Sequence, residues 1–298
     1  MRELTVMNLL PQRLDQYLLE QYPHLGMGRI NKAFRENKIK LNGKKLPLNT
    51  RVIQGDVIAL YLKDEQLEAP GKRALDPKSI LYEDDGVLIL NKPAGLPVDG
   101  GEDSLLERAR VHSPSARLCH RLDTGTSGLV MLAKTNGAEK ALTQLIRERT
   151  VEKTYLCVTF GRPQPPAATL HGWLEKDSAK GMVYVHTKKE TAQSKEVLTR
   201  YRTVAVSGRL ALLEVDLITG RTHQIRAHLA SIGCPILGDS KYGNNAANRE
   251  LKLKYQALCA WRLRFPSGLE GVLSGLSGRE ITVPKPWYCG QVVDGTLK

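Results

Sequence analysis

Residues 120–129 read HRLDTGTSGL, and this stretch decides how the rest of the chain is interpreted. It presents a single carboxylate, Asp123, in a turn that also carries basic groups. Gly125 and Gly128 supply the backbone freedom that such a turn needs. The neighbouring Arg121 favours the ionised form of the carboxylate. We therefore interpret Asp123 as a reactive group within reach of a substrate.

Two more blocks surround this turn in the sequence. Residues 91–96, NKPAGL, predict a tight turn upstream. Residues 219–226, TGRTHQIR, supply a second basic element downstream. Three such blocks in this order are not expected by chance, so we read them as parts of one site.

The blocks resemble those of the RluA-type family of pseudouridine synthases, enzymes that isomerise uridine to pseudouridine in structured RNA. The resemblance begins near Ile80, includes Lys153-Thr154-Tyr155 and continues past residues 239–243, DSKYG. The motifs around Asp123 and Arg221 are specific to that family, whereas the turn at Lys92 alone is a weak signal.

The resemblance implies three catalytic residues. Asp123 corresponds to the family's nucleophile or base, and whether it attacks the anomeric carbon or removes a ribose proton stays open. Arg221 matches the ion-pair partner of that aspartate, although an arginine there can also bind a phosphate. Tyr155 matches a tyrosine that stacks on the target uracil and can help to move the proton of carbon five. Without the resemblance, Asp123 would be read as a turn cap and Tyr155 as a core residue.

The target base lies inside folded RNA, so the enzyme must extrude it. The resemblance implies that Arg121 enters the gap left in the RNA, with a surface ion pair as its alternative role. Ile225 is expected to form an apolar wall beside Asp123 and Tyr155, which is compatible with ordinary helix packing. We add His120 to the residues expected to contact RNA.

Composition narrows the class of protein further. The chain has 298 residues, 41% of them hydrophobic, which is enough for a sizeable core. Its formal net charge of +13 predicts an anionic partner, and nucleic acid is favoured over lipid. The apolar runs are too short to span a bilayer and no signal peptide is evident, so we expect a soluble, cytoplasmic protein and, by default, a monomer.

Neither a disulfide framework nor a metal site is expected. The five cysteines are widely spread and no Cys-x-x-Cys pair occurs. His223 and His228 are five residues apart, which separates them around a helix, so we expect them to form hydrogen bonds instead. The isomerisation also requires no redox cofactor, and we expect none.

Residues 1–62 are expected to form a small α/β RNA-binding domain. Helical periodicity occurs around Leu14 and again around Ile30. The Asn42-Gly43 pair predicts a hairpin over residues 38–46, and residues 55–61 read as a closing strand. This order resembles the S-four-like RNA-binding domain, named after a ribosomal small-subunit protein. Asn37 stands where that family often has glycine, and it can still adopt the left-handed conformation.

This first domain carries much of the excess charge. Residues 1–63 contain eleven Lys and Arg against five Asp and Glu. A charged face is usually only solvated, but charge together with the fold pattern favours contact with RNA phosphates. The residues we expect to contact RNA here are Arg13, Arg29, Lys32, Arg35, Lys44 and Lys45.

Residues 63–78 have the composition of a linker, and residues 79–298 are expected to form the catalytic domain. Strand-like runs occur at 86–91, 128–134, 154–160, 195–203, 210–219 and 256–265, and helical patterns at 136–149 and 223–232. They do not alternate as regular βαβ units. We therefore expect an α+β fold with a mostly antiparallel mixed sheet and flanking helices.

Two other functions remain as alternatives. Asp123-Thr124-Gly125 matches the short signature of aspartic proteases, but that mechanism needs a second carboxylate and no second Asp-Thr/Ser-Gly occurs. A non-catalytic RNA-binding or ribosome-assembly protein is the other alternative, although such a protein needs no reactive aspartate. By family analogy the N-terminal domain favours ribosomal RNA over transfer RNA as the partner.

Overall fold

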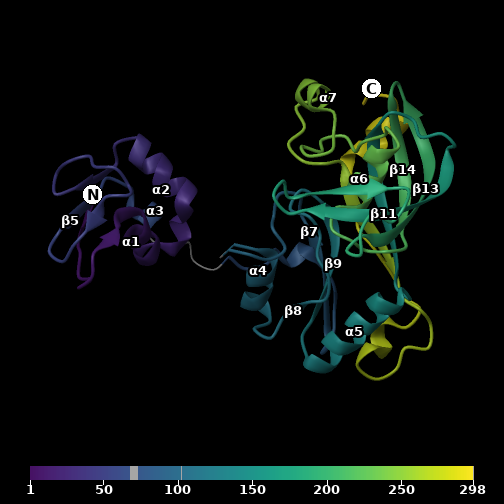
Figure 1. Cartoon of the computed structure of the whole chain (residues 1–298). Helices are drawn as coiled ribbons and strands as arrows, with labels where there is room; N and C mark the ends of the chain where they lie inside the picture. Colours follow the sequence, from purple (N-terminus) through teal and green to yellow (C-terminus); the bar gives the residue numbers. More distant parts are fainter. Residues whose placement is uncertain (68–72, 102, 298) are drawn as a thin grey trace. The chain divides into compact units, whose positions relative to one another are not determined.

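The computed structural model describes residues 1–67, 73–101 and 103–297 (Figure 1). The chain forms two compact units, Met1–Arg73 and Ala74–Lys298. Residues 68–72 of the expected linker lie outside the described residues. Leu67, in the short helix α3 (Asp64–Leu67), is buried in the core of the first unit, so that unit extends past residue 62.

The first unit combines short helices with a small antiparallel sheet. Helices α1 (Leu14–Gln21) and α2 (Gly26–Arg35) are joined by the 3-10 turn η1 (Pro23–Leu25). The sheet has the order β1 (Arg2–Thr5), β5 (Val57–Leu60), β3 (Ile39–Leu41), and β2 (Gln12–Arg13) pairs with β4 (Arg51–Val52). The unit has its own hydrophobic core, which includes Leu14, Leu18, Ile30, Leu41 and Ile58.

The expected hairpin forms only as a turn. Asn42 and Gly43 have φ of 49° and 77°, and a bridge joins Leu41 to Lys44. The second arm does not continue; β3 pairs instead with β5, because that pairing places the buried Ile39 and Leu41 beside buried residues of β5. Asn37 has a φ of 59°, so its expected left-handed conformation is confirmed.

The second unit is built on one 11-stranded sheet. Along its main path the strand order is β12-β11-β13-β14-β10-β15-β9-β7-β6. The described strand pairs are antiparallel except for β15 with β9, which confirms the mostly antiparallel α+β fold. The strands of this path are β6 (Ile80–Glu83), β7 (Val87–Lys92), β9 (Ser127–Ala133), β10 (Glu152–Phe160), β11 (Ala167–Asp177), β12 (Met182–His186), β13 (Lys195–Ser207), β14 (Leu210–Leu217) and β15 (Leu258–Arg264). Two short strands, β8 (Arg117–Leu118) and β16 (Glu280–Thr282), pair with β9 and β15.

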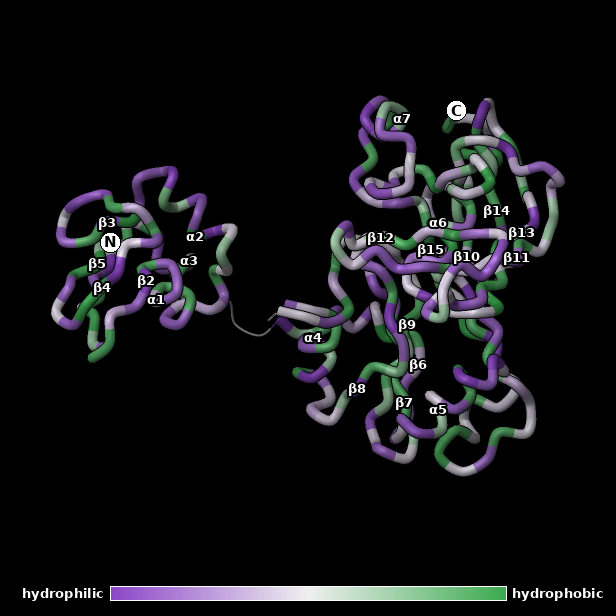
Figure 2. Tube along the Cα trace, in the orientation of Figure 1, coloured by the Kyte–Doolittle hydropathy of each residue, from purple (hydrophilic) through white to green (hydrophobic). Residues whose placement is uncertain are grey.

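Helices and a continuous core complete this unit. Its helices are α4 (Leu105–His112), α5 (Asn136–Glu148), α6 (Gln224–Ser231), α7 (Asn245–Glu250) and α8 (Trp287–Val293), with 3-10 turns η2 (Pro77–Ser79) and η3 (Gly271–Leu276). Figure 2 shows hydrophobic segments inside both units. Helix α5 is capped by Thr135, whose hydroxyl accepts a hydrogen bond from the Ala138 amide. In the described part of the chain, no helix has the length and apolar character needed to cross a membrane.

The parallel junction between β9 and β15 holds the loop that carries Asp123. Gly128, the second residue of β9, lies opposite Ala260 of β15 and has a φ of +106°. A Cβ atom at Gly128 would lie 2.2 Å from the carbonyl oxygen of Ala260. Only glycine fits this position, because any side chain meets both strained backbone and a steric clash.

Gly128→Ala should therefore destabilise the protein by about 2 kcal/mol or more. The measurement is equilibrium unfolding in denaturant, followed by a signal from the second unit. Gly290→Ala in α8 is the matched control, because a Cβ there meets nothing within 4 Å and alanine favours a helix. Equal stabilities of the two variants would contradict the close approach at Gly128.

Candidate active site

Asp123 lies in the loop between β8 and β9, and backbone hydrogen bonds fix its position. Its carbonyl oxygen accepts a hydrogen bond from the Thr126 amide at 3.0 Å. The next carbonyl, that of Thr124, accepts from the Gly95 amide at 2.7 Å. The Asp123 side chain is 24% exposed, so the carboxylate is held in place and still faces an opening.

Arg226, in the first turn of α6, is the ion-pair partner of this carboxylate. Its Nη1 donates to Oδ2 of Asp123 at 2.7 Å. Its Nε and Nη2 donate to the two carboxylate oxygens of Asp239 at 2.7 and 2.9 Å. The Arg226 side chain is only 5% exposed and Asp239 is fully buried, so the guanidinium is fixed from behind while it holds Asp123.

Charge compensation explains how this buried cluster is stable. Burial alone would lower the pKa of Arg226, but the hydrogen bonds and charges of Asp239 and Asp123 outweigh burial and raise it. Burial likewise would raise the pKa of Asp239, yet Arg226 and the backbone amides of Tyr242 and Lys241 lower it. Arg226 and Asp239 are therefore both ionised, as a buried ion pair must be to repay its desolvation.

Arg221, the partner that the sequence suggested, does not make this contact. It is exposed and precedes α6, and its backbone amide donates to Oε1 of Gln224. The chain turns between the two arginines, because His223 adopts a left-handed conformation with a φ of 55° and α6 begins at the next residue. Arg226 then points into the protein. The ion-pair assignment to Arg221 is therefore wrong, and Arg226 takes that place.

His223 and Tyr242 line the other side of the carboxylate. Nε2 of His223 lies 3.9 Å from Oδ1 of Asp123, and its Nδ1 is hydrogen-bonded to the Tyr242 hydroxyl at 3.0 Å. The Tyr242 ring also lies under the Arg226 guanidinium, 5.2 Å from ring centre to carbon. Burial lowers the pKa of His223 despite the nearby charge of Asp123, so a neutral imidazole faces Oδ1 of Asp123.

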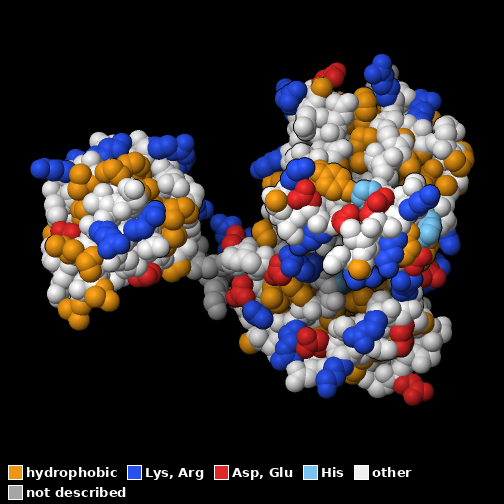
Figure 3. Space-filling model, viewed as in Figure 1, with side chains coloured by type: hydrophobic (Ala, Val, Ile, Leu, Met, Phe, Trp, Pro, Cys, Tyr) orange, Lys and Arg blue, Asp and Glu red, His pale blue; other side chains and the backbone are white. Residues whose placement is uncertain are grey.

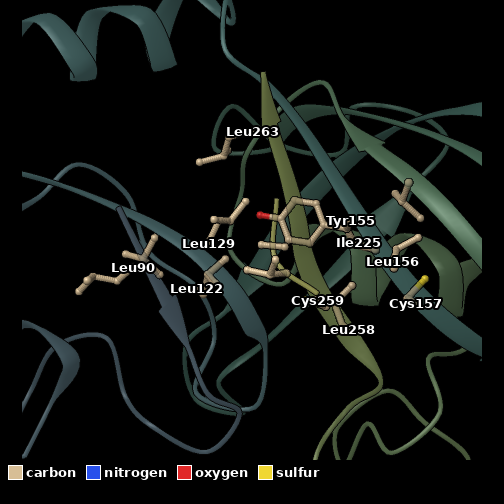
Figure 4. Close-up of a cluster of buried hydrophobic side chains, with 14 of the residues drawn as sticks. Leu90, Leu122, Leu129, Tyr155, Leu156, Cys157, Ile225, Leu258, Cys259 and Leu263 are labelled. Atoms are coloured by element: carbon tan, nitrogen blue, oxygen red, sulfur yellow. The ribbon is translucent and has the colours of Figure 1, made fainter. Parts of the chain in front are cut away.

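Tyr155 and Ile225 form the apolar part of the site. Figure 4 shows the Tyr155 ring among Leu122, Leu129, Ile225 and Cys259. Tyr155 comes from β10 and is 6% exposed, and Ile225 comes from α6 and is 4% exposed. Burial, with a further contribution from the charge of Asp123, raises the pKa of Tyr155, so its hydroxyl is protonated at neutral pH.

Lys92, in the NKPAGL block, is a buried cation behind the Asp123 loop. Its Nζ donates to the carbonyl oxygens of Pro93, Leu96 and Thr124 at 3.0, 2.8 and 3.1 Å. Burial lowers its pKa to about 8 while the charge of Asp123 opposes the shift, so the group is still mainly an ammonium at neutral pH. In the sequence, this turn was only a weak signal of the family. Nothing in the sequence pattern indicated that Lys92 fixes the loop that carries Asp123.

Arg121 and His120 occupy different environments. Arg121 is 70% exposed and pairs with Asp99 at 2.9 Å, and no ion pair joins it to Asp123 among the described residues. We expected Arg121 to act on the Asp123 carboxylate as a neighbouring charge, and no direct contact between the two side chains supports that expectation. His120 accepts a hydrogen bond from the Met131 amide, and burial together with the charge of Lys153 lowers its pKa to about 3. His120 is thus neutral and its Nε2 is already occupied within the protein.

The expected hydrogen-bonding histidines are confirmed. His228 is hydrogen-bonded through Nδ1 to the Thr199 hydroxyl, and His223 to Tyr242 as described above. Within the described ranges, no three side chains of His, Cys, Asp or Glu gather as a metal-binding group.

The six basic candidates of the first unit fall into two kinds. All six are exposed, and in the described part of the chain five of them make no hydrogen bond or ion pair with a buried carboxylate: Arg29, Lys32, Arg35, Lys44 and Lys45. Lys45 lies over the Phe34 ring, 5.1 Å from its centre, which brings the 42–45 turn beside α2. Arg13 differs, because its guanidinium makes two hydrogen bonds to the buried Asp15. Figure 3 shows several Lys and Arg side chains on the visible face of this unit.

Comparison with known proteins gives the class of enzyme. The family model described as RNA pseudouridylate synthase matches residues 86–231, which include Asp123, Tyr155 and Arg226. A protein of Rickettsia bellii named ribosomal large subunit pseudouridine synthase C is 36% identical over 81% of this chain and 86% of its own length. One of Nitrosomonas europaea named ribosomal large subunit pseudouridine synthase D is 33% identical over 88% and 79%.

Solved structures agree with this class. Human RNA pseudouridylate synthase domain containing 1 is 27% identical, with a TM-score of 0.60 over 70% of this chain and 84% of its own. Human RNA pseudouridylate synthase domain containing 4 is 26% identical, with a TM-score of 0.58 over 73% and 92%. The chain belongs to the RNA pseudouridylate synthase family, and the expected RluA-type resemblance is confirmed.

The two arginines of the TGRTHQIR block should respond differently to substitution. Arg226→Met should abolish isomerisation and also destabilise the fold by about 3 to 5 kcal/mol, because it leaves Asp239 buried without a counter-charge. Arg221→Met should keep its turnover rate at saturating RNA. The measurements are tritium release from 5-labelled uridine in RNA and unfolding in denaturant.

The double variant Arg226→Met with Asp239→Leu separates the two effects. Removing both charges of a buried pair is often neutral for stability, so this variant should fold and still be inactive. Turnover near that of the parent in the folded double variant would show that Arg226 has no part in the reaction.

Proposed function

We propose that this enzyme isomerises uridines of large-subunit ribosomal RNA, with Asp123 as the reacting carboxylate. The observation that carries the proposal is the partly exposed Asp123 side chain, whose Oδ2 is fixed by a buried arginine and whose Oδ1 accepts no hydrogen bond from the described residues. The choice of RNA rests on the relatives, several of which are named ribosomal large subunit pseudouridine synthases.

The reaction needs few groups. The N-glycosidic bond breaks, the uracil turns, carbon five joins the same anomeric carbon, and the carbon-five proton leaves. Asp123 can attack the anomeric carbon or remove a ribose proton, and either step would use one of its carboxylate oxygens. Arg226 holds the carboxylate in one orientation and compensates its charge, in the role first assigned to Arg221.

Tyr155 is proposed to contact the uracil face, because its ring lies beside Ile225 in an apolar wall near Asp123. Its raised pKa makes the phenol a hydrogen-bond donor more readily than a base. Removal of the carbon-five proton by Tyr155 therefore requires a change in its surroundings when substrate binds.

Arg121 is proposed to enter the space left by the extruded base. Its ion pair with Asp99 involves a side chain that is 70% exposed, so little free energy is lost when the pair opens. We further propose that the enzyme acts in the cytoplasm and as a monomer. We also propose that it uses no metal, since one carboxylate, one arginine and one tyrosine are sufficient for a reaction with no change of redox state.

The alternative functions fit the site less well. In an aspartic-type hydrolase two carboxylates share a proton, but Asp239 is separated from Asp123 by the guanidinium that binds both. A purely RNA-binding protein gives no reason for a buried ion pair that orients a partly exposed carboxylate. Catalysis accounts for that arrangement directly.

Asp123→Asn should fold, bind RNA and form no pseudouridine, because the amide keeps the shape and removes the nucleophile or base. The measurement is tritium release from 5-labelled uridine in ribosomal RNA, with affinity measured separately. Asp85→Asn is the control, since Asp85 is an exposed carboxylate in the β6–β7 turn. Turnover of Asp123→Asn within tenfold of the parent would refute the catalytic assignment.

We also propose that the first unit binds RNA phosphates through Arg29, Lys32, Arg35, Lys44 and Lys45. Changing all five to Gln should reduce the slope of log affinity against log salt by roughly 0.9 for each phosphate that is no longer bound, with little effect on turnover at saturating RNA. Arg13→Gln is the control; its cation is already paired with Asp15, so its slope should be nearly that of the parent. An unchanged slope in the five-residue variant would mean that this face is only solvated.

A further inference from the structure

Lys153 is a half-buried lysine beside the active site that the reaction described above does not use. It lies near the start of β10, two residues before Tyr155. Residues i and i+2 of a strand share one face, so Lys153 and Tyr155 project from the same side of the sheet. Their Cα atoms are roughly 6.6 Å apart at the usual rise of a strand.

The ammonium of Lys153 has no acceptor within the described chain. Among the residues that the structure describes, no hydrogen bond or ion pair involves its Nζ. Burial lowers its pKa, and the positive charge of the nearby Arg149 lowers it further. His120, which is also close, is neutral and uses Nε2 to accept from a backbone amide. The surroundings therefore contain a second cation and no compensating anion.

An exposed glycine lies close to this ammonium. Gly220 is exposed, and a Cβ atom there would lie 3.8 Å from Nζ of Lys153. The ammonium thus lies against a backbone without a side chain, in the loop that leads to Arg221 and α6. Arg149, the cation whose charge acts on Lys153, also has an unusual backbone conformation. It ends α5 with a φ of 61°, a conformation that usually favours glycine.

A half-buried, uncompensated charge is costly for a fold, because desolvation of an ion is repaid only by a partner. A methionine would fill similar space without this cost. The lysine is therefore best explained by a partner that arrives from outside, and that partner must be an anion.

We propose that Lys153, together with Arg149, binds a backbone phosphate of the RNA next to the nucleotide whose base contacts Tyr155. A phosphodiester fits because it is anionic, is present at every nucleotide, and can approach over Gly220 without meeting a side chain. The proposal rests on the proposed placement of the target uridine at Asp123 and Tyr155. It adds an anion site that positions the sugar-phosphate of that nucleotide.

The test compares full-length Lys153→Met, Lys153→Arg and parent enzyme on a ribosomal RNA fragment that the parent modifies. The measurements are RNA affinity from 50 to 200 mM salt, tritium release, and the thermal midpoint. Lys140→Met is the matched control, because Lys140 is an exposed lysine of α5 far from the proposed phosphate site. It precedes Arg149 by nine residues, which is roughly 13 Å along a helix.

Lys153→Met should bind RNA more weakly, and its slope of log affinity against log salt should be smaller by about 0.7 to 0.9. Between 50 and 200 mM salt the parent should therefore lose about threefold more affinity than this variant. Its thermal midpoint should equal or exceed that of the parent. Lys153→Arg and Lys140→Met should both keep the slope of the parent.

Three results would overturn the proposal: an unchanged slope in Lys153→Met, an equal reduction in Lys140→Met, or a Lys153→Met protein that is less stable or does not fold. The last result would mean that the ammonium stabilises the protein itself. A parent enzyme that forms no pseudouridine in ribosomal RNA would instead refute the proposed function, so the two failures are distinguishable.

Discussion

The guanidinium of Arg226 is the point on which the site depends, because it binds two carboxylates that lie far apart in the sequence. Asp239 holds it through two hydrogen bonds in a fully buried setting, and the remaining donor orients Asp123. This joins the loop before β9, the first turn of α6 and the segment after α6. Buried ion pairs contribute little net stability, since desolvation offsets their attraction. What this pair supplies is a single geometry for the Asp123 carboxylate.

A second buried cation fixes the same loop through its backbone. Lys92 gathers three carbonyl oxygens, one of them from Thr124, the residue after Asp123. Side chain and main chain of the loop are thus held by different cations from different elements, and the close approach at Gly128 fixes where β9 begins. A carboxylate held in this way loses little orientational freedom when substrate binds, which is how positioning lowers an activation barrier.

The sequence predicted those features that depend on local signals. The strong apolar runs became β7, β9, β10, β13, β14 and β15, and the motif around Asp123 located the loop whose carboxylate Arg226 binds. Strands β11 and β12 were missed because few of their residues are apolar and buried: only Gly172 and Leu174 of β11 and Val183 of β12 are buried, so no strong apolar run marks them. The choice between Arg221 and Arg226 was equally inaccessible: both lie in one block, and which of them points inward is decided by the left-handed turn at His223, a tertiary feature that no spacing rule encodes.

The same reasoning separates the cations of this basic chain into two groups. Arg226 and Arg13 each bind a buried carboxylate, so their charges are used within the fold and add little to the field that an RNA would meet. Lys153 and the exposed cations of α2 do not bind a buried carboxylate, so their charges remain available to release counterions from an RNA backbone. A net charge of +13 therefore overstates the number of phosphate contacts if it is read as a simple count. A cation that already binds a buried carboxylate is used within the fold. A cation without such an acceptor is left to contact the RNA.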